Sequence, residues 1–234
     1  MGILGDRLIV DGDLYRLRSD GRSVADLVGR LESGERPAAM VAPGAVTPAD
    51  VVAALAHDAL GPDDAPGLPL IQASPRRPRL ERVLSEPAWA EVFPRAARPT
   101  RLAMSAGLLQ VHDFWDASHE AAQKADDLGE RDFSAYWHGI AHRREPDASN
   151  AAYWFRRVGK HPTYQPLATA ARALLDEHGD KELAARLIRD DAWNSTAMID
   201  LCTTARPGTP REGLARRLQR LEMWLLLEAT FSSL

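Results

Sequence analysis

The 234-residue chain has a single cysteine, Cys202, which excludes an intramolecular disulfide and any cysteine-rich zinc site. No stretch approaches the roughly 20 uncharged apolar residues that a membrane span needs. The start, MGILGDRLIVDGD, is charged too early for a secretory signal. Acids outnumber bases by 33 to 29, which leaves no overall positive charge for nucleic acid or an anionic membrane. We therefore expect a soluble, cytoplasmic protein without a membrane partner or a nucleic-acid surface.

With 45% hydrophobic and 26% charged residues, the chain has enough apolar side chains to bury a core. We predict a mainly α-helical protein in three parts. Residues 1–60 are expected to form a small hairpin-and-helices module. Residues 61–100 hold eight of the sixteen prolines, which excludes long helices and predicts an extended connector. Residues 101–234 are expected to form an all-α domain.

In the first part, Asp11-Gly12 between residues 7–10 and 13–17 predicts a β-hairpin, because Asp-Gly tolerates the positive φ angles of a two-residue turn. Ser23 is expected to cap a helix that ends at Gly34. A second helix is expected from Thr47 to Ala56, with proline at its first helical position.

The stretch SDGRSVADLVGRLESGERPAAMVAPGAVTPADVVAALA, residues 19–56, resembles a widespread bacterial family of small antitoxin-like proteins. The resemblance covers about a sixth of the chain, and the family's glycine-rich lead-in is replaced here by DGDLYRLRSDGR. Such modules resemble helix-turn-helix units, but residues 1–60 carry six arginines against nine acids. DNA phosphates require the opposite sign, so we expect a protein partner or a structural role for this module.

Beyond Thr100 the hydrophobic pattern is helical, with breaks at glycine or proline. The expected helices are 101–127, 132–145, 148–158, 165–178, 180–190, 192–204 and 211–231. The last is expected to bury its C-terminal end, where Glu222 and Glu228 need a partner such as Arg156, Arg157 or a metal, or else an edge position.

Histidine and aromatic residues are concentrated in residues 112–164, which hold five of the seven histidines. Two polar stripes have helical spacing. The first consists of His112, Asp116, His119 and Gln123, and the second of His138, His142 and Glu145.

A His-x3-His pair on one helix suits a divalent metal that the facing helix completes. The predicted metal ligands are His112, Asp116, His119, His138 and His142, around one zinc or iron ion. His119, His138, His142 and Glu145 are the predicted catalytic groups, for hydrolytic or oxidative chemistry. A metal-free pocket and a purely structural histidine network remain alternatives, and whether the chain is an enzyme stays open.

The second stripe is followed by basic residues. Arg143, Arg144, Arg156 and Arg157 are candidates to hold a small anionic molecule. The alternative is that they form ordinary ion pairs with Glu145, Asp147 and Asp116.

SHEAAQ at residues 118–123 and AYWHGIAHRREPDASNAAYWFRRVGKHP at 135–162 resemble a family of uncharacterised bacterial and fungal proteins. The family pattern is SHxxxQ … YWHxxxHRREPDxxNxxYWFRRVGxHP, and it brings no known activity. The resemblance adds further residues to the candidate ligand-binding set. That set is Gln123, Arg143, Arg144, Asn150, Tyr153, Arg156, Arg157 and His161.

A second function remains open. Residues 132–158 resemble one tetratricopeptide unit, with Gly139, Ala151 and Phe155 near its glycine, alanine and aromatic positions. One such unit predicts a helical hairpin rather than a repeat array. The alternative is therefore a non-enzymatic interaction protein, in which the antitoxin-like module and this hairpin bind partners.

Overall fold

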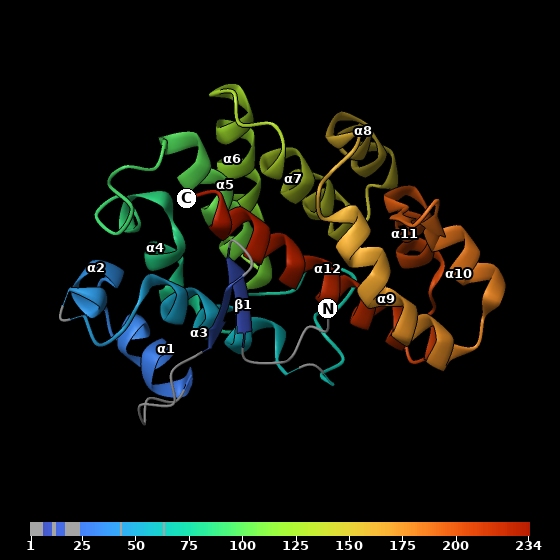
Figure 1. The fold of residues 1–234 in the computed structure, drawn as a ribbon, viewed down its shortest axis with the longest axis horizontal. Coiled ribbons are helices and arrows are strands. Elements are labelled where there is room, and N and C mark those ends of the chain that lie inside the picture. The colour runs from blue at the N-terminus through green and yellow to red at the C-terminus, as the bar shows by residue number, and fades with distance from the viewer. Residues whose placement is uncertain (1–6, 11–12, 17–23, 43, 63) are drawn as a thin grey trace.

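The computed structural model describes residues 7–10, 13–16, 24–42, 44–62 and 64–234, the first two ranges as backbone only. Within these ranges the chain is mainly helical, as expected, with twelve α-helices and two short pairs of strands. Figure 1 shows the longest helix, α12, crossing the middle of the molecule, with α1–α4 on one side and α8–α11 on the other.

Two strands and three helices make up the described part of the first sixty residues. They are β1 (Arg7–Val10), β2 (Asp13–Arg16), α1 (Val24–Glu32), α2 (Pro37–Val41) and α3 (Pro48–Leu60). The strands pair antiparallel, and the expected turn and the Ser23 cap lie outside the described residues. Thr47 and Asp50 form a capping box at the start of α3, which satisfies backbone N–H groups that the helix leaves unpaired.

The described part of the proline-rich segment before residue 98 has three short helices, η1 (Pro78–Leu80), α4 (Glu81–Leu84) and η2 (Glu86–Ala88). Within this segment, Leu80 and Trp89 are fully buried in the common core. Arg77 pairs with Asp58 and Glu32 at 2.9 and 2.8 Å, which fastens the basic run at residues 75–79 to α3 and α1.

The prediction of one continuous helix over 101–127 is wrong, because the segment forms two helices. These are α5 (Arg98–Val111) and α6 (Trp115–Asp127). Asp113 between them has φ +66°, a left-handed conformation that no α-helix continues through. The Asp113 carboxylate accepts hydrogen bonds from Arg144 and from the backbone of Ala73, contacts that pattern along the chain does not reveal.

The next two helices, α7 (Phe133–Arg144) and α8 (Ala148–Val158), form the predicted hairpin. A Cβ on Gly139 would lie only 3.0 Å from the ring of Phe155, so glycine is what allows the two helices to pack this closely. The side chain of Asp147 accepts from Asn150 N and caps α8.

The segment after α9 (Tyr164–His178) departs from the expected pair of long helices. Its elements are α10 (Lys181–Leu187), β3 (Ile188–Arg189), β4 (Ala192–Trp193) and α11 (Ser195–Thr204). Asp190 and Asp191 both have positive φ, which gives a two-residue turn whose twist matches that of the paired strands. The tight turn shortens both helices relative to the prediction.

The last helix, α12 (Pro210–Ser232), buries most of its side chains from Leu218 onward, as its apolar pattern predicts. One hydrophobic cluster runs from Leu27 on α1 to Leu227 on α12. This cluster crosses the boundaries expected near residues 60 and 100, and the division into separate parts stays a prediction. No helix in the described ranges is long and apolar enough to cross a membrane.

Candidate metal centre

Three histidines from two helices meet between α6 and α7. His119 lies on α6, and His138 and His142 lie one turn apart on α7. One ring nitrogen from each lies within 4.8 Å of the other two. The ring centroids are 4.3 Å apart for His119 and His138, and 5.1 Å apart for His119 and His142. The facing helix therefore supplies the third imidazole that the His-x3-His spacing requires.

Two tryptophans support the first two rings. Trp115 stacks on His119 with centroids 5.0 Å apart, and Trp154 stacks on His138 at 3.8 Å. Trp115 is itself held by a hydrogen bond of 2.8 Å from its indole N–H to the carbonyl of Ala141. The spacing of the polar stripes gave no sign of this role for Trp115, although the concentration of aromatic residues in 112–164 pointed to the region.

The third ring, that of His142, is held at its edge and on one face. Its Nδ1 lies 2.7 Å from Oε2 of Glu145. Nδ2 of Asn150 lies 3.1 Å from Nε2 and 3.3 Å from Nδ1 of the same ring. If Nδ2 of Asn150 were in the plane of the His142 ring at these two distances, it would overlap with Cε1 of that ring. The amide therefore packs over the face of the ring. The in-plane lone pair of Nε2 therefore stays directed away from Asn150.

Two of the imidazoles, those of His138 and His119, favour their neutral form. Burial lowers the pKa of His138 to about 3, with further lowering by the charges of His119, His142 and Arg157. Burial also lowers the pKa of His119, and the charge of His142 adds to the effect. Nδ1 of His138 is buried and has no hydrogen-bond partner among the described residues. Neutral imidazole is the form that binds a metal, so no proton has to be displaced from His138 at neutral pH.

The remaining two predicted metal ligands, His112 and Asp116, do not belong to this group of three histidines. His112 sits before the break between α5 and α6, where it is buried and hydrogen-bonded to the backbone of Leu55 on α3. Asp116 lines an open cleft of about 600 Å³ that also includes Gln72 and Trp115. The first polar stripe is therefore divided, because its four residues do not share one helix.

The predicted ligand-binding residues Arg143 and Arg144 have fully buried side chains in ion pairs. Arg143 lies 2.5 Å from Glu222 on α12, and Arg144 lies 2.5 Å from Asp113. These pairs correspond to the ion-pair alternative, but the acids involved are not those named from the sequence. Glu222 likewise finds its partner in Arg143, while Glu228 accepts from the indole of Trp224 at 2.9 Å.

The other candidates differ in exposure. Tyr153 is 46% exposed and Arg156 is exposed on the same helix, α8. Gln123 donates to Asp127 at 2.9 Å. His161 is buried, with its Nδ1 2.7 Å from the hydroxyl of Thr163.

Arg157 is the one predicted arginine whose charge acts on His138. Its guanidinium lies 5.2 Å above the ring of Trp154, which in turn stacks on His138. Its Nη2 is 2.9 Å from both carboxylate oxygens of Asp126, and its side chain is 35% exposed. It therefore combines a structural ion pair with a partly accessible positive charge near the three histidines.

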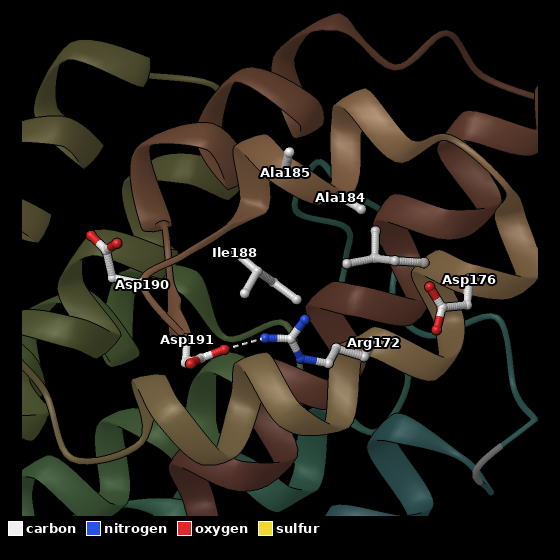
Figure 2. A pocket seen from close by; sticks show the side chains of 8 residues that line it. Arg172, Asp176, Ala184, Ala185, Ile188, Asp190 and Asp191 are labelled. Atoms are coloured by element: carbon white, nitrogen blue, oxygen red, sulfur yellow. Dashed lines mark hydrogen bonds and ion pairs between the residues drawn. The ribbon is translucent and has the colours of Figure 1, made fainter.

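A second hollow, of about 310 Å³, lies between α9, α10 and the β3–β4 turn (Figure 2). Arg172 reaches across it to Asp191, and Asp176 and Asp190 lie on its rim. None of the site residues predicted from the sequence lines this hollow. The ion pair between Arg172 and Asp191 is largely exposed to solvent. The hollow is separate from the histidine group.

Three imidazoles match the protein ligands of one class of catalytic zinc site, in which water or substrate takes the fourth position. Zinc–nitrogen bonds of about 2.0–2.1 Å place tetrahedral ligands about 3.3 Å apart. The three ring nitrogens lie within 4.8 Å of one another, so the rings would have to draw together where their separation exceeds about 3.3 Å. The donor set therefore fits a divalent transition metal.

Comparisons with models of protein families, with curated proteins and with solved structures find no match to this chain.

Proposed function

We propose that the chain binds one divalent transition metal, zinc or iron, through His119, His138 and His142. The metal would serve hydrolytic or oxidative chemistry on a small anionic molecule. The proposal depends on one observation, the convergence of these three imidazoles within 4.8 Å. A metal at such a site acts as a Lewis acid and lowers the pKa of bound water.

The surroundings of the site support a preformed centre. Trp115, Trp154 and Asn150 each cover a face of one imidazole, so little side-chain freedom is lost when a metal binds. Arg157 supports the anionic character of the ligand, because its charge reaches His138 and its side chain is partly accessible. Arg143 and Arg144 have no part in this proposal, since both are buried against acids.

Metal analysis of untagged protein tests the proposal. We expect close to one zinc or iron per chain, and a lower melting temperature in the presence of a chelator, because metal that binds only the folded state stabilises it. His119→Ala and His142→Ala should each lose the metal while keeping the helical circular dichroism spectrum. His178→Ala, on α9 and outside the group, is the control and should keep it.

A wild-type protein without metal, whose melting is unchanged by chelator and by added zinc, would contradict the proposal. That result would favour the second candidate, a non-enzymatic interaction protein with an antitoxin-like first module. The observation in favour of this candidate is the α7–α8 hairpin, which leaves the large apolar ring of Tyr153 46% exposed.

A further inference from the structure

We propose that Glu145 is a positioning residue of this metal centre rather than one of its ligands. Its carboxylate accepts a hydrogen bond from Nδ1–H of His142, which fixes the tautomer of the ring and directs Nε2 to the metal. The inference rests on the proposed metal site. It concerns Glu145, which belongs to one of two groups of potential metal ligands that share His142.

The two groups share His142. One consists of His119, His138 and His142, and the other of His142, Glu145 and Asp147, and both have ligand atoms within 4.8 Å. If both groups use the same ring nitrogen of His142, a metal can occupy only one of the two groups at a time. The geometry around Glu145 and Asp147 distinguishes the two.

The distance between Glu145 and His142 is that of a hydrogen bond. Oε2 lies 2.7 Å from Nδ1, a typical length for a charge-assisted N–H···O bond. Two ligands of one tetrahedral zinc ion would lie about 3.3 Å apart. Glu145 is also partly exposed, with 38% of its side chain accessible to solvent.

Asp147 is already engaged in local structure. Its Oδ1 accepts from the backbone N–H of Asn150 at 3.0 Å and from the hydroxyl of Ser149 at 2.7 Å. These bonds cap the N-terminus of α8. Using Asp147 as a ligand would draw its carboxylate away from the cap, whereas Nδ1 of His138 has no hydrogen-bond partner among the described residues to lose.

The consequence for His142 is a defined donor pattern. When the Nδ1–H group of His142 donates to Glu145, the lone pair is on Nε2, and the amide of Asn150 over the ring face limits rotation about χ2. A carboxylate on the second nitrogen also makes the metal-binding nitrogen more basic. Glu145 thus acts through His142 and does not touch the metal.

Zinc and cobalt titrations of the full chain test this assignment. Glu145→Gln should still bind one metal per chain with an unchanged Co²⁺ absorption spectrum, but with an affinity lower by roughly 10–100-fold. Asp147→Asn should bind zinc as the wild type does. His119→Ala should lose the site and the spectrum.

The ring tautomer provides a readout that a purely structural role would not change. In nitrogen-15 NMR of the metal-free chain, His142 should be the Nδ1–H tautomer in the wild type and a mixture in Glu145→Gln. A Glu145→Gln protein that matches the wild type in zinc affinity and tautomer would overturn the inference. So would a metal lost from Glu145→Gln but retained by His119→Ala. A wild type that binds no metal contradicts the proposed function instead, and the NMR comparison still tests Glu145.

Discussion

Arg143 shows how strongly a single residue in this fold depends on its partner. Its side chain is fully buried, and Glu222 accepts from it, from the hydroxyl of Tyr136 at 3.0 Å and from the indole of Trp193 at 3.3 Å. Burial opposes the charged form of Arg143, but the charge of Glu222 and its hydrogen bond raise the pKa of Arg143 above its usual value. Arg143 therefore keeps its positive charge inside the core.

Glu222→Ala should lower the free energy of unfolding by about 3–5 kcal/mol, because it leaves a buried guanidinium uncompensated. The control is Asp200→Ala, which breaks the exposed pair with Arg186 and should cost less than about 1 kcal/mol. Urea denaturation measures both. Equal losses in the two variants would show that burial does not determine the value of these pairs.

The residues of the candidate site were predictable to different degrees. His138 and His142 follow from spacing on one helix, and His119 from the expectation that a facing helix completes the set. The partners of the arginines did not follow, because Glu222 lies 79 positions from Arg143 and Asp113 lies 31 positions from Arg144. Ion pairs over such separations depend on how helices pack.

At the scale of elements, the crossing of α5 with α7 and α12 depends on Gly107. A Cβ built on Gly107 would lie 2.6 Å from the ring of Trp137 and 2.9 Å from Leu227. The same addition on Gly213, near the start of α12, meets nothing within 4 Å. Both glycines lie within helices, but side chains of other helices crowd Gly107 and leave the space beside Gly213 open.

Gly107→Ala should therefore destabilise the protein by about 1–3 kcal/mol, since overpacking outweighs the gain in helix propensity. Gly213→Ala should stabilise it by about 0.5–1 kcal/mol, because alanine restricts the unfolded chain without a clash. Thermal unfolding of both variants measures the difference. A stabilised Gly107→Ala protein would contradict the packing described for α5.

Helix boundaries set by glycine or proline were largely predictable, as for α7, α8 and α9. The break at Asp113 was not, because no breaker residue marks it. Its left-handed conformation coincides with tertiary hydrogen bonds to Arg144 and Ala73. As a result the predicted stripe of four polar residues became His112 on one side and Asp116, His119 and Gln123 on the other.

At the scale of the whole molecule, buried histidines couple the fold to pH. Burial lowers the pKa of His112 to about 4, where the ring joins the end of α5 to Leu55 of α3. Burial lowers the pKa of His161 to about 4 as well, among aromatic rings of α7 and α9. Both are neutral in the folded protein at pH 7.

An unfolded histidine has a pKa near 6.5, so between about pH 6.5 and 4 the unfolded chain binds more protons than the folded one. Each buried ring makes its full contribution to the free energy of unfolding above about pH 6.5. This contribution decreases as the pH falls, and about 3 kcal/mol is lost for each ring at pH 4. Denaturation between pH 7 and 4.5 should show this slope, and His112→Gln should reduce it. A slope unchanged in His112→Gln would contradict the role of this ring.

Composition and periodicity were sufficient to predict a mainly helical chain, the α7–α8 hairpin, the buried end of α12 and the region where histidines gather. These features depend on neighbours within one or two helical turns, or on average hydrophobicity. Tertiary structure decided the rest: the break at Asp113, the partners of Arg143 and Arg144, the path of the proline-rich segment through the core, and which three histidines meet. The physical reason is that each of these depends on side chains far apart in sequence, whose distances are set only when the helices pack around α12.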